Sequence, residues 1–345
     1  MAADARVLVQ RAAFFNREGH VMIMIERTST YVARWTLYTC LALVLAAPGL
    51  ASAQSRYSGI VVFGTSLSDS GNAFTLFGDH ATPPDFNLNP LLIPNAPYAR
   101  GGHHFSNGAT WIEQFASSIG LEGSVRPALV KTNAHATNYA VGAARAYDDG
   151  VNFNLGRQVH EFLLRSNGVA SPEALYVIEM GSNDIRDAFQ IYATGGNGGP
   201  VLTQALSSIA ASIQTLYVAG AREFVVWVAP NVALTPALRT LGPAAGGLAT
   251  SLTQAFNGGL DQVLNQLSFG LPGITFARLD AYQILDSIVA NPAAFDLTAV
   301  TTACVTPNDA PFTCTHVDGY LFWDGIHPTK AGHAILAREL TQVLP

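Results

Sequence analysis

Ser66 is the first of several side chains whose types and spacing could hydrolyse an ester. It lies in the segment 63–72 (FGTSLSDSGN), directly after the β-branched run 60–62. A strand followed by a turn of small residues and then a helix would present this hydroxyl at the carboxyl end of the strand, where open parallel sheets bind ligands. Gly, Ser, Asp and Asn are also the residues that any turn prefers. A nucleophilic role therefore requires a base and oxyanion donors elsewhere in the chain.

A candidate base and its orienting carboxylate stand near the end of the chain. Asp324 and His327 are three residues apart in the segment 322–328 (FWDGIHP). On a tight turn, this spacing lets the carboxylate accept a hydrogen bond from Nδ1–H and leaves Nε2 facing outward as a base. Taken alone, the same residues are typical of an Asp-Gly turn and a polar helix start.

Two further segments could supply oxyanion donors. Asn183 follows the apolar run 174–180 (ALYVIEM), which predicts a strand, so its amide would lie at the same sheet edge as Ser66. A side-chain amide there can donate a hydrogen bond to a developing oxyanion, and it can also cap the following helix. In the segment 138–144 (NYAVGAA), Gly142 could bring a backbone N–H to the same oxygen.

The pattern of apolar residues predicts the elements that would position these groups. Short apolar runs typical of buried parallel strands occur at 59–63, 174–180, 223–229 and 273–279. Apolar residues at helical spacing predict helices over 110–119, 151–166, 201–219, 248–267 and 329–344. Strands that alternate with helices indicate an α/β fold with a parallel sheet covered on both faces.

Taken in order, the four segments resemble the blocks of the GDSL, or SGNH, hydrolase family, which carry Ser, Gly, Asn and His. The matches are 63–72, 138–144, 181–184 and 324–328. The resemblance implies a flavodoxin-like three-layer α/β/α sandwich and a serine enzyme that acts on carboxylic esters without a metal or organic cofactor. It also implies these roles: nucleophile for Ser66, base for His327, orienting carboxylate for Asp324, and oxyanion donors from the Ser66 N–H, the Gly142 N–H and the Asn183 amide. Four other histidines, His103, His104, His316 and His333, match no block and are expected to be surface or structural.

One position departs from the family pattern. The usual Gly-Asp-Ser-Leu is Gly64-Thr65-Ser66-Leu67 in this chain. Thr keeps a hydroxyl that can donate and accept, but it loses the carboxylate charge. If the family Asp chiefly hydrogen-bonds neighbouring backbone, Thr can replace it at a modest cost. If its charge tunes the Ser–His pair, an Asp at this position would raise the rate. Thr65 also motivates a second hypothesis, a non-catalytic binding protein on an esterase scaffold.

The natural ester is left open by the sequence. The segment 105–108 (FSNG), followed by Trp111 and Glu113, resembles the bacterial branch described as phospholipase, lecithinase or hemolysin-like, and related plant lipases. The Pro-rich segment 78–102 carries apolar residues that could wall a substrate cleft or pack for stability alone. These features favour lipid or phospholipid acyl esters, and the alternative is removal of acetyl groups from carbohydrate.

The start of the chain is typical of a secretory signal peptide. Arg34 precedes the apolar stretch 35–47, and a small-x-small cleavage site ends at Ala53. A membrane span needs about 20 apolar residues, which makes a signal anchor the less favoured alternative. Translation is expected to start at Met22 or Met24, because the residues before them exceed the usual length of a signal.

Cleavage after Ala53 would leave a single hydrolase domain over 54–345, secreted or periplasmic. The segment 1–53 holds five Arg and three acidic residues, so the remainder carries 18 − 5 = 13 basic and 24 − 3 = 21 acidic residues, a net charge of −8. A surface so poor in Lys and Arg argues against nucleic acid as a partner. A small-molecule or lipid ester is the expected partner, with no stable membrane span after signal removal.

Three cysteines occur in the whole sequence, and one of them, Cys40, lies within the apolar stretch of the signal. The other two, Cys304 and Cys314, would close a short loop in an oxidising compartment, which predicts a disulfide. Metal ligation by this pair is the rival interpretation, and the sequence near it lacks a Cys/His cluster with zinc-like spacing.

Overall fold

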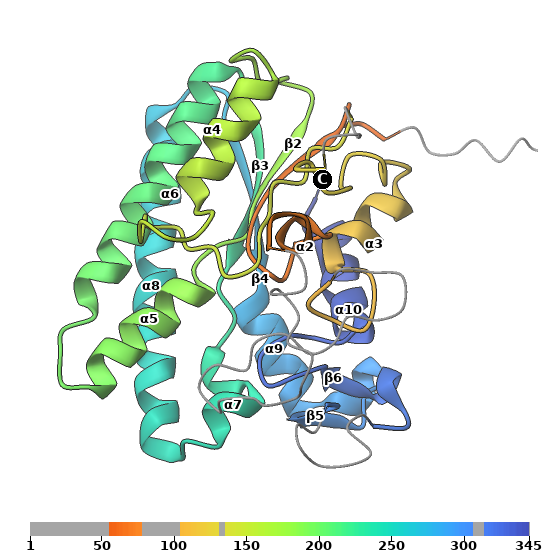
Figure 1. Ribbon diagram of the computed structural model, residues 1–345, viewed down its shortest axis with the longest axis vertical. Coiled ribbons are helices and arrows are strands. Elements are labelled where there is room, and N and C mark those ends of the chain that lie inside the picture. Colours follow the sequence, from red (N-terminus) through yellow and green to blue (C-terminus); the bar gives the residue numbers. More distant parts are fainter. Residues whose placement is uncertain (1–54, 78–103, 131–134, 306–313, 345) are drawn as a thin grey trace, which may run out of the picture. The chain divides into compact units, whose positions relative to one another are not determined.

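The computed structural model describes residues 55–77, 104–130, 135–305 and 314–344. Its central element is a parallel sheet of four strands in the order β1-β2-β3-β4 (Figure 1). The strands are β1 (Ile60–Phe63), β2 (Leu175–Ile178), β3 (Glu223–Val228) and β4 (Thr275–Asp280). The predicted signal segment and the Pro-rich segment 78–102 lie outside the described residues.

An extended stretch pairs with the other edge of β1. The Val62 N–H donates to the Thr137 carbonyl at 2.9 Å, and the Tyr139 N–H donates to the Val62 carbonyl at 2.7 Å. This pairing runs parallel to β1. Residues 137–139 and β2 therefore flank β1 on opposite sides. In open α/β sheets, ligands bind at such a point, where the strand order reverses.

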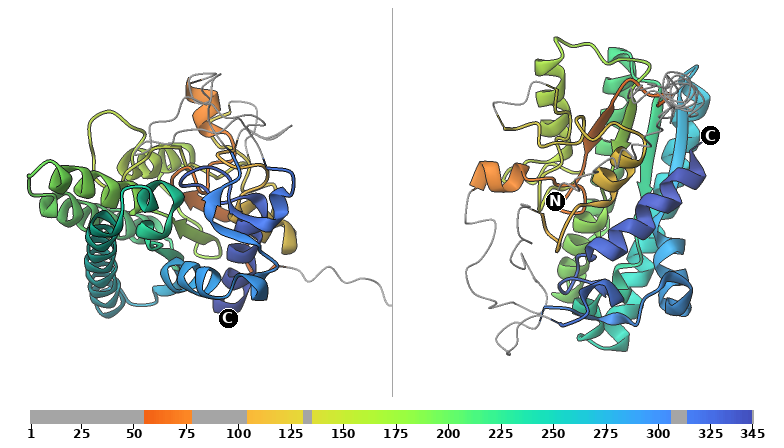
Figure 2. Two further views of the ribbon diagram at one scale, coloured as in Figure 1. Left: turned by 90° about the horizontal axis from the view of Figure 1, so that it is seen from below. Right: turned by 90° about the vertical axis from the view of Figure 1, so that its right-hand side faces the viewer.

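Helices cover both faces of the sheet (Figures 1 and 2). One face is covered by α4 (Leu155–Arg165), α5 (Ser182–Ala193), α6 (Gly199–Ala219) and α8 (Pro243–Gly270), and the other by α3 (Trp111–Ser118) and α10 (Lys330–Val343). The shorter elements are α2 (Asn72–Phe77), α7 (Pro236–Arg239), α9 (Ala281–Ala290), and the two-stranded sheet of β5 (Ala299–Ala303) and β6 (Tyr320–Phe322). The fold is thus the expected three-layer α/β/α sandwich.

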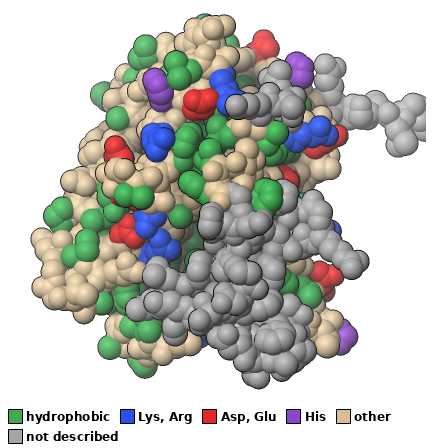
Figure 3. All heavy atoms as spheres, in the orientation of Figure 1, with side chains coloured by type: hydrophobic (Ala, Val, Ile, Leu, Met, Phe, Trp, Pro, Cys, Tyr) green, Lys and Arg blue, Asp and Glu red, His purple; other side chains and the backbone are tan. Residues whose placement is uncertain are grey.

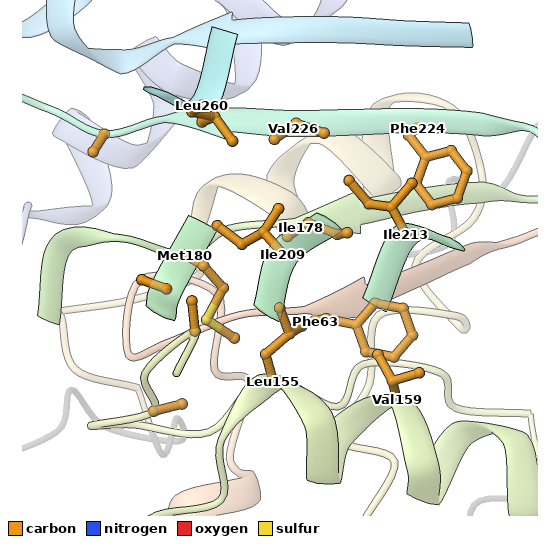
Figure 4. Packing of buried hydrophobic residues seen from close by; sticks show 14 of the residues in the cluster. Phe63, Leu155, Val159, Ile178, Met180, Ile209, Ile213, Phe224, Val226 and Leu260 are labelled. Carbon is orange, nitrogen blue, oxygen red and sulfur yellow. The ribbon is translucent and has the colours of Figure 1, made fainter. Parts of the chain in front are cut away.

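Alternate strand residues form the two core layers. Phe63, Ile178 and Phe224 point toward α4, α6 and α8, where Leu155, Ile213 and Leu260 meet them (Figure 4). The intervening residues Ile60, Val62, Val177 and Val225 belong to the second layer, against α3 and α10. Because β1, β2 and most of β3 are buried on both faces, these strands appear in the sequence as apolar runs rather than alternating ones. The edge strand β4 is only partly buried and includes Arg278 and Asp280.

Helix α6 is long and apolar. Within the described part of the chain, it is the one helix that could cross a membrane by length and composition. Its apolar side, however, is part of the core: Leu202, Ile209, Ile213 and Leu216 are buried against the sheet and neighbouring helices. Core packing therefore accounts for this composition.

Candidate active site

Ser66, His327 and Asp324 are joined by two hydrogen bonds. The Ser66 Oγ lies 2.8 Å from His327 Nε2, and His327 Nδ1 lies 2.6 Å from Asp324 Oδ2. Asp324 is fully buried and His327 is 4 % exposed, whereas Ser66 is partly exposed. A buried carboxylate that accepts from Nδ1–H fixes the tautomer in which Nε2 can take the serine proton. The three residues that the sequence predicts as a triad are thus in contact.

Hydrogen bonds within the loop between β6 and α10 hold Asp324 and His327 in contact across their three-residue spacing. The other oxygen of Asp324 accepts the N–H groups of Ile326 at 2.8 Å and His327 at 2.7 Å. The Trp323 N–H donates to the His327 carbonyl at 2.8 Å, which closes the turn. Thr329 then caps α10 by accepting the Gly332 N–H. The turn therefore fixes carboxylate and imidazole together.

The FSNG segment clamps this loop from outside. The Phe105 ring lies 5.4 Å from the His327 ring, centroid to centroid. The Ser106 hydroxyl donates to the Pro328 carbonyl at 2.8 Å, and Asn107 Oδ1 accepts the Lys330 N–H at 2.6 Å. The sequence pattern associates FSNG with a substrate class, but in this structure the segment holds the loop that carries His327. This role was not predicted, since no residue of FSNG carries catalytic chemistry of its own.

Asn183 lies at the predicted sheet edge, at the start of α5. Gly181 makes the turn from β2 possible, because its φ of +116° is strained for other residues and a Cβ there would lie 2.4 Å from the Phe256 ring. The Asn183 amide donates one hydrogen bond to the Ala144 carbonyl at 2.8 Å. This bond orients the amide and leaves its second N–H free to donate. Asn183 lines one pocket together with Ser66 and His327.

The Gly142 N–H has a different partner from the one expected. It donates to Asp69 Oδ2 at 2.8 Å, so it is not free to hold a substrate oxygen in this structure. A Cβ at Gly142 would lie 2.3 Å from the Phe105 ring, which explains the glycine by close packing. Asp69 also accepts three N–H groups at the start of α2, from Gly71, Asn72 and Ala73. Burial raises the pKa of Asp69 to about 6, and these backbone donors oppose the rise.

The backbone N–H of Ala143, the next residue, is a donor without an acceptor in the described structure. Ala143 is exposed and has a φ of +64°, the left-handed conformation that favours glycine. Among the residues that the structure describes, nothing accepts the N–H of Ala143 or that of Ser66. The adjacent Val141 and Gly142 N–H groups bond to Gly64 and Asp69, so this loop lies directly beside the Ser66 turn.

Replacing Ala143 with glycine is expected to stabilise the protein by about 1 kcal/mol. The left-handed conformation costs a non-glycine residue about 1–2 kcal/mol, and the extra freedom of glycine in the unfolded chain offsets part of that gain. Midpoints of urea unfolding would measure the change. The matched control is Ala144→Gly, at a buried site without positive φ, which should destabilise. A fall in stability of Ala143→Gly would contradict the strain.

Glu179 is a buried carboxylate whose role was not predicted from the sequence. It directly follows β2 and is 0 % exposed. Its Oε2 accepts the Thr65 N–H at 2.8 Å and the Ser68 hydroxyl at 3.1 Å, and both oxygens accept the Thr65 hydroxyl at 3.0 Å. Ser68 in turn accepts the Trp111 indole N–H at 3.0 Å. Burial raises the pKa of Glu179 to about 7, and the bonds from Thr65 and Ser68 oppose that rise.

The remaining sequence predictions concern histidines and cysteines. Cys304 and Cys314 form the predicted disulfide. His104 is buried and pairs with Glu113 at 3.0 Å, His333 is buried in α10, and His316 is exposed. His103 lies outside the described residues. Within the described ranges, no group of three or more His, Cys, Asp or Glu residues is arranged to hold a metal ion.

Comparison with known proteins identifies the family. The family model of the GDSL-like lipase/acylhydrolases matches residues 60–340. Two GDSL esterase/lipases of Arabidopsis thaliana are similar, one 25% identical over 88% of this chain and 96% of its own length, the other 29% identical over 86% and 88%. Among solved structures, the extracellular lipase from Streptomyces rimosus is 16% identical with a TM-score of 0.38, over 83% of this chain and 99% of that one. The chain therefore belongs to the GDSL-like lipase/acylhydrolase family and is a serine enzyme that hydrolyses ester bonds.

Proposed function

We propose that Ser66 is the nucleophile of a two-step ester hydrolysis. The hydrogen-bonded line from Ser66 Oγ through His327 to Asp324 is the observation that supports it. His327 Nε2 takes the serine proton as Oγ attacks the ester carbonyl, and then gives that proton to the departing alcohol. A water molecule, deprotonated by the same nitrogen, attacks the acyl-serine, which releases the acid and restores Ser66.

Three donors are proposed to hold the oxyanion: the N–H groups of Ser66 and Ala143 and the free amide N–H of Asn183. The Ala143 N–H takes the place that the sequence pattern gives to Gly142, because the Gly142 N–H is bound to the Asp69 carboxylate. Each donor is held in advance by the surrounding backbone, so little reorganisation accompanies the reaction.

The direct test is covalent labelling. A fluorophosphonate probe should modify Ser66, and the purified protein should hydrolyse p-nitrophenyl esters. Mass mapping of the labelled peptide identifies the serine. Ester hydrolysis that persists when Ser66 is fully labelled would contradict the proposal. A protein that neither reacts with the probe nor hydrolyses any ester would instead support a binding protein on this scaffold.

An acyl chain longer than acetyl is the proposed occupant of the space beside Ser66. The pocket at Ser66 adjoins a second, almost entirely apolar pocket, and the two share Leu67, Pro230, Thr235 and Ile326 in their walls. The second pocket extends to Leu285 and Ile288 in α9. Burying each methylene of a chain there would contribute about 0.8 kcal/mol. This lining favours lipid acyl esters over the alternative of acetylated carbohydrate.

Arg186 supports a phosphate-bearing ester, as in a phospholipid. It lies on α5 and lines the same pocket as Ser66. Its Nε is buried without a hydrogen-bond partner in the described structure, and its nearest carboxylate, Asp187, is 3.9 Å away and is already held by Arg145 at 2.8 Å. Figure 3 shows such basic and acidic side chains grouped on the face where α5 lies. Burial and the repulsion of Arg145 lower the pKa of Arg186, so an anion beside it would relieve both effects.

Arg186→Gln is therefore expected to lower kcat/KM for dihexanoyl phosphatidylcholine about 10- to 100-fold, because a hydrogen bond to a charged group contributes about 1.5–3 kcal/mol. Hydrolysis of the uncharged dihexanoylglycerol should stay within about threefold of the wild-type rate. Arg157→Gln, which removes an equal charge from an exposed position, is the matched control. An equal loss on both substrates would show that Arg186 does not recognise the phosphate.

Export is the last part of the proposal. The segment 1–53 is proposed to direct secretion and to be removed after Ala53. The basis is the sequence pattern, a basic flank, an apolar stretch and a small-x-small site. N-terminal sequencing of the protein recovered outside the cytoplasm would test it, and a mature chain that begins well before Gln54 would contradict it.

A further inference from the structure

The Glu179 carboxylate lies under the nucleophile turn without a part in the proposed chemistry. Its three donor groups come from Thr65, immediately before Ser66, and from Ser68, two residues after it. A carboxylate with no N–H or O–H of its own is suited to gather converging donors. The turn is therefore tied on both sides of Ser66 to the end of β2, the strand that also leads to Asn183.

Thr65 is the position at which the family pattern has Asp. An Asp there would set a second carboxylate against Glu179, since the Thr65 hydroxyl is already 3.0 Å from both Glu179 oxygens. Two carboxylates at such a distance cannot both be ionised, and one must take up a proton. Thr65 and Glu179 are thus matched: the neutral side chain at 65 donates, and the acidic side chain at 179 accepts.

We propose that Glu179 is a positioning residue for Ser66 and that it supplies, from the neighbouring strand, the buried carboxylate that the family pattern places at residue 65. By holding Thr65 and Ser68, it fixes the direction of the Ser66 hydroxyl and of the Ser66 N–H. The inference rests on the proposed role of Ser66, because it concerns how that residue is held. It predicts that an Asp at position 65 lowers the rate, against the alternative in which the charge of that Asp would raise it.

Packing around the carboxylate is tight on the strand side. A Cβ on Gly64 would lie 2.9 Å from Glu179 Oε2 and 3.1 Å from the Ser68 Cβ. Asp184, at the start of α5, also acts on Glu179 and repels its ionised form. The hydrogen bonds from Thr65 and Ser68 favour the ionised form of Glu179, whereas burial and the repulsion from Asp184 disfavour it. The ionisation of Glu179 therefore depends on how many donors it has.

A charge-exchange experiment tests the inference. Glu179→Gln should lower kcat for p-nitrophenyl butyrate and the rate of fluorophosphonate labelling about 10- to 100-fold, because the new NH₂ group faces donors and leaves one of them unpaired. Thr65→Asp should lower both rates at least as far. The double variant Thr65→Asp with Glu179→Gln restores one carboxylate and one donor, and should regain at least tenfold over either single variant.

The double variant separates positioning from general packing. If each substitution acted through packing alone, the two losses of activity would add in the double variant, whereas matched hydrogen bonding between residues 65 and 179 would restore activity. Two milder variants cover the case in which an acidic variant fails to fold: Thr65→Ser keeps both donors and should stay within about threefold of wild type, whereas Thr65→Val loses the hydroxyl and should fall about tenfold. Thr65→Asp at or above the wild-type rate, or Thr65→Val equal to Thr65→Ser, would overturn the inference. A wild-type protein that the probe does not label would overturn the proposed function instead.

Discussion

Ser66→Ala is expected to lower kcat for short-chain p-nitrophenyl esters about a millionfold. In a serine protease with the same three groups, removing the nucleophile has an effect of about this size, and the residual rate comes from the oxyanion donors. Here the hydroxyl is the group that His327 Nε2 contacts at 2.8 Å. Steady-state rates at saturating ester measure the loss, and fluorophosphonate labelling should vanish in the same variant.

The matched control for this loss is Ser117→Ala, at an exposed serine of α3. It should retain the wild-type rate and the wild-type labelling. Thermal midpoints of Ser66→Ala and wild type should agree within a few degrees, because Ser66 is partly exposed and its removal leaves no large cavity. Unchanged hydrolysis by Ser66→Ala would show that another group attacks the ester.

Asp324→Asn is expected to lower kcat about 10⁴-fold with little change in structure. An asparagine oxygen can still accept the N–H groups of Ile326 and His327. Its NH₂ group, however, would face His327 Nδ1 and donate to it, which moves the imidazole proton to Nε2. The base then presents a donor to Ser66 instead of an acceptor. The corresponding substitution in a serine protease has an effect of about this size for the same reason.

Stopped-time assays at high enzyme concentration can follow a rate this low, and circular dichroism checks the fold. Asp318→Asn, at an exposed acid between β5 and β6, controls for the loss of one negative charge and should have no effect. A variant of Asp324 that keeps a tenth of the wild-type kcat would mean that His327 does not depend on this carboxylate for its tautomer.

The main sheet was predictable because its signals are local. All four strands of the main sheet were predicted with ends within two residues. The signal is clearest for β1, β2 and β3, which are buried on both faces and appear as apolar runs. The contact between Ser66 and His327 was expected only from the resemblance to the family, whose blocks carry Ser, Gly, Asn and His in this order. The FWDGIHP segment contains its own turn, so the Asp–His pair needs no distant partner.

What escaped prediction depends on contacts between distant segments. The three residues of β6 are too short for a periodic signal, and the sheet of β5 and β6 was not predicted. Gly142 fitted an oxyanion donor by its position in a motif, but the Asp69 carboxylate, 73 residues earlier, takes its N–H. Likewise, nothing local in the sequence links Glu179 to Thr65, which are 114 residues apart. Such pairings are set by tertiary packing alone.

Ser66 and His327 are 261 positions apart in the sequence, which has a consequence for how activity arises during folding. Contacts between residues so far apart in the sequence form slowly, because the intervening chain must first lose conformational entropy. A chain that is only partly folded carries a serine without its base, and such a serine is a weak nucleophile. Under the proposed mechanism, esterase activity is therefore expected to appear only late in folding, once Ser66 and His327 are in contact.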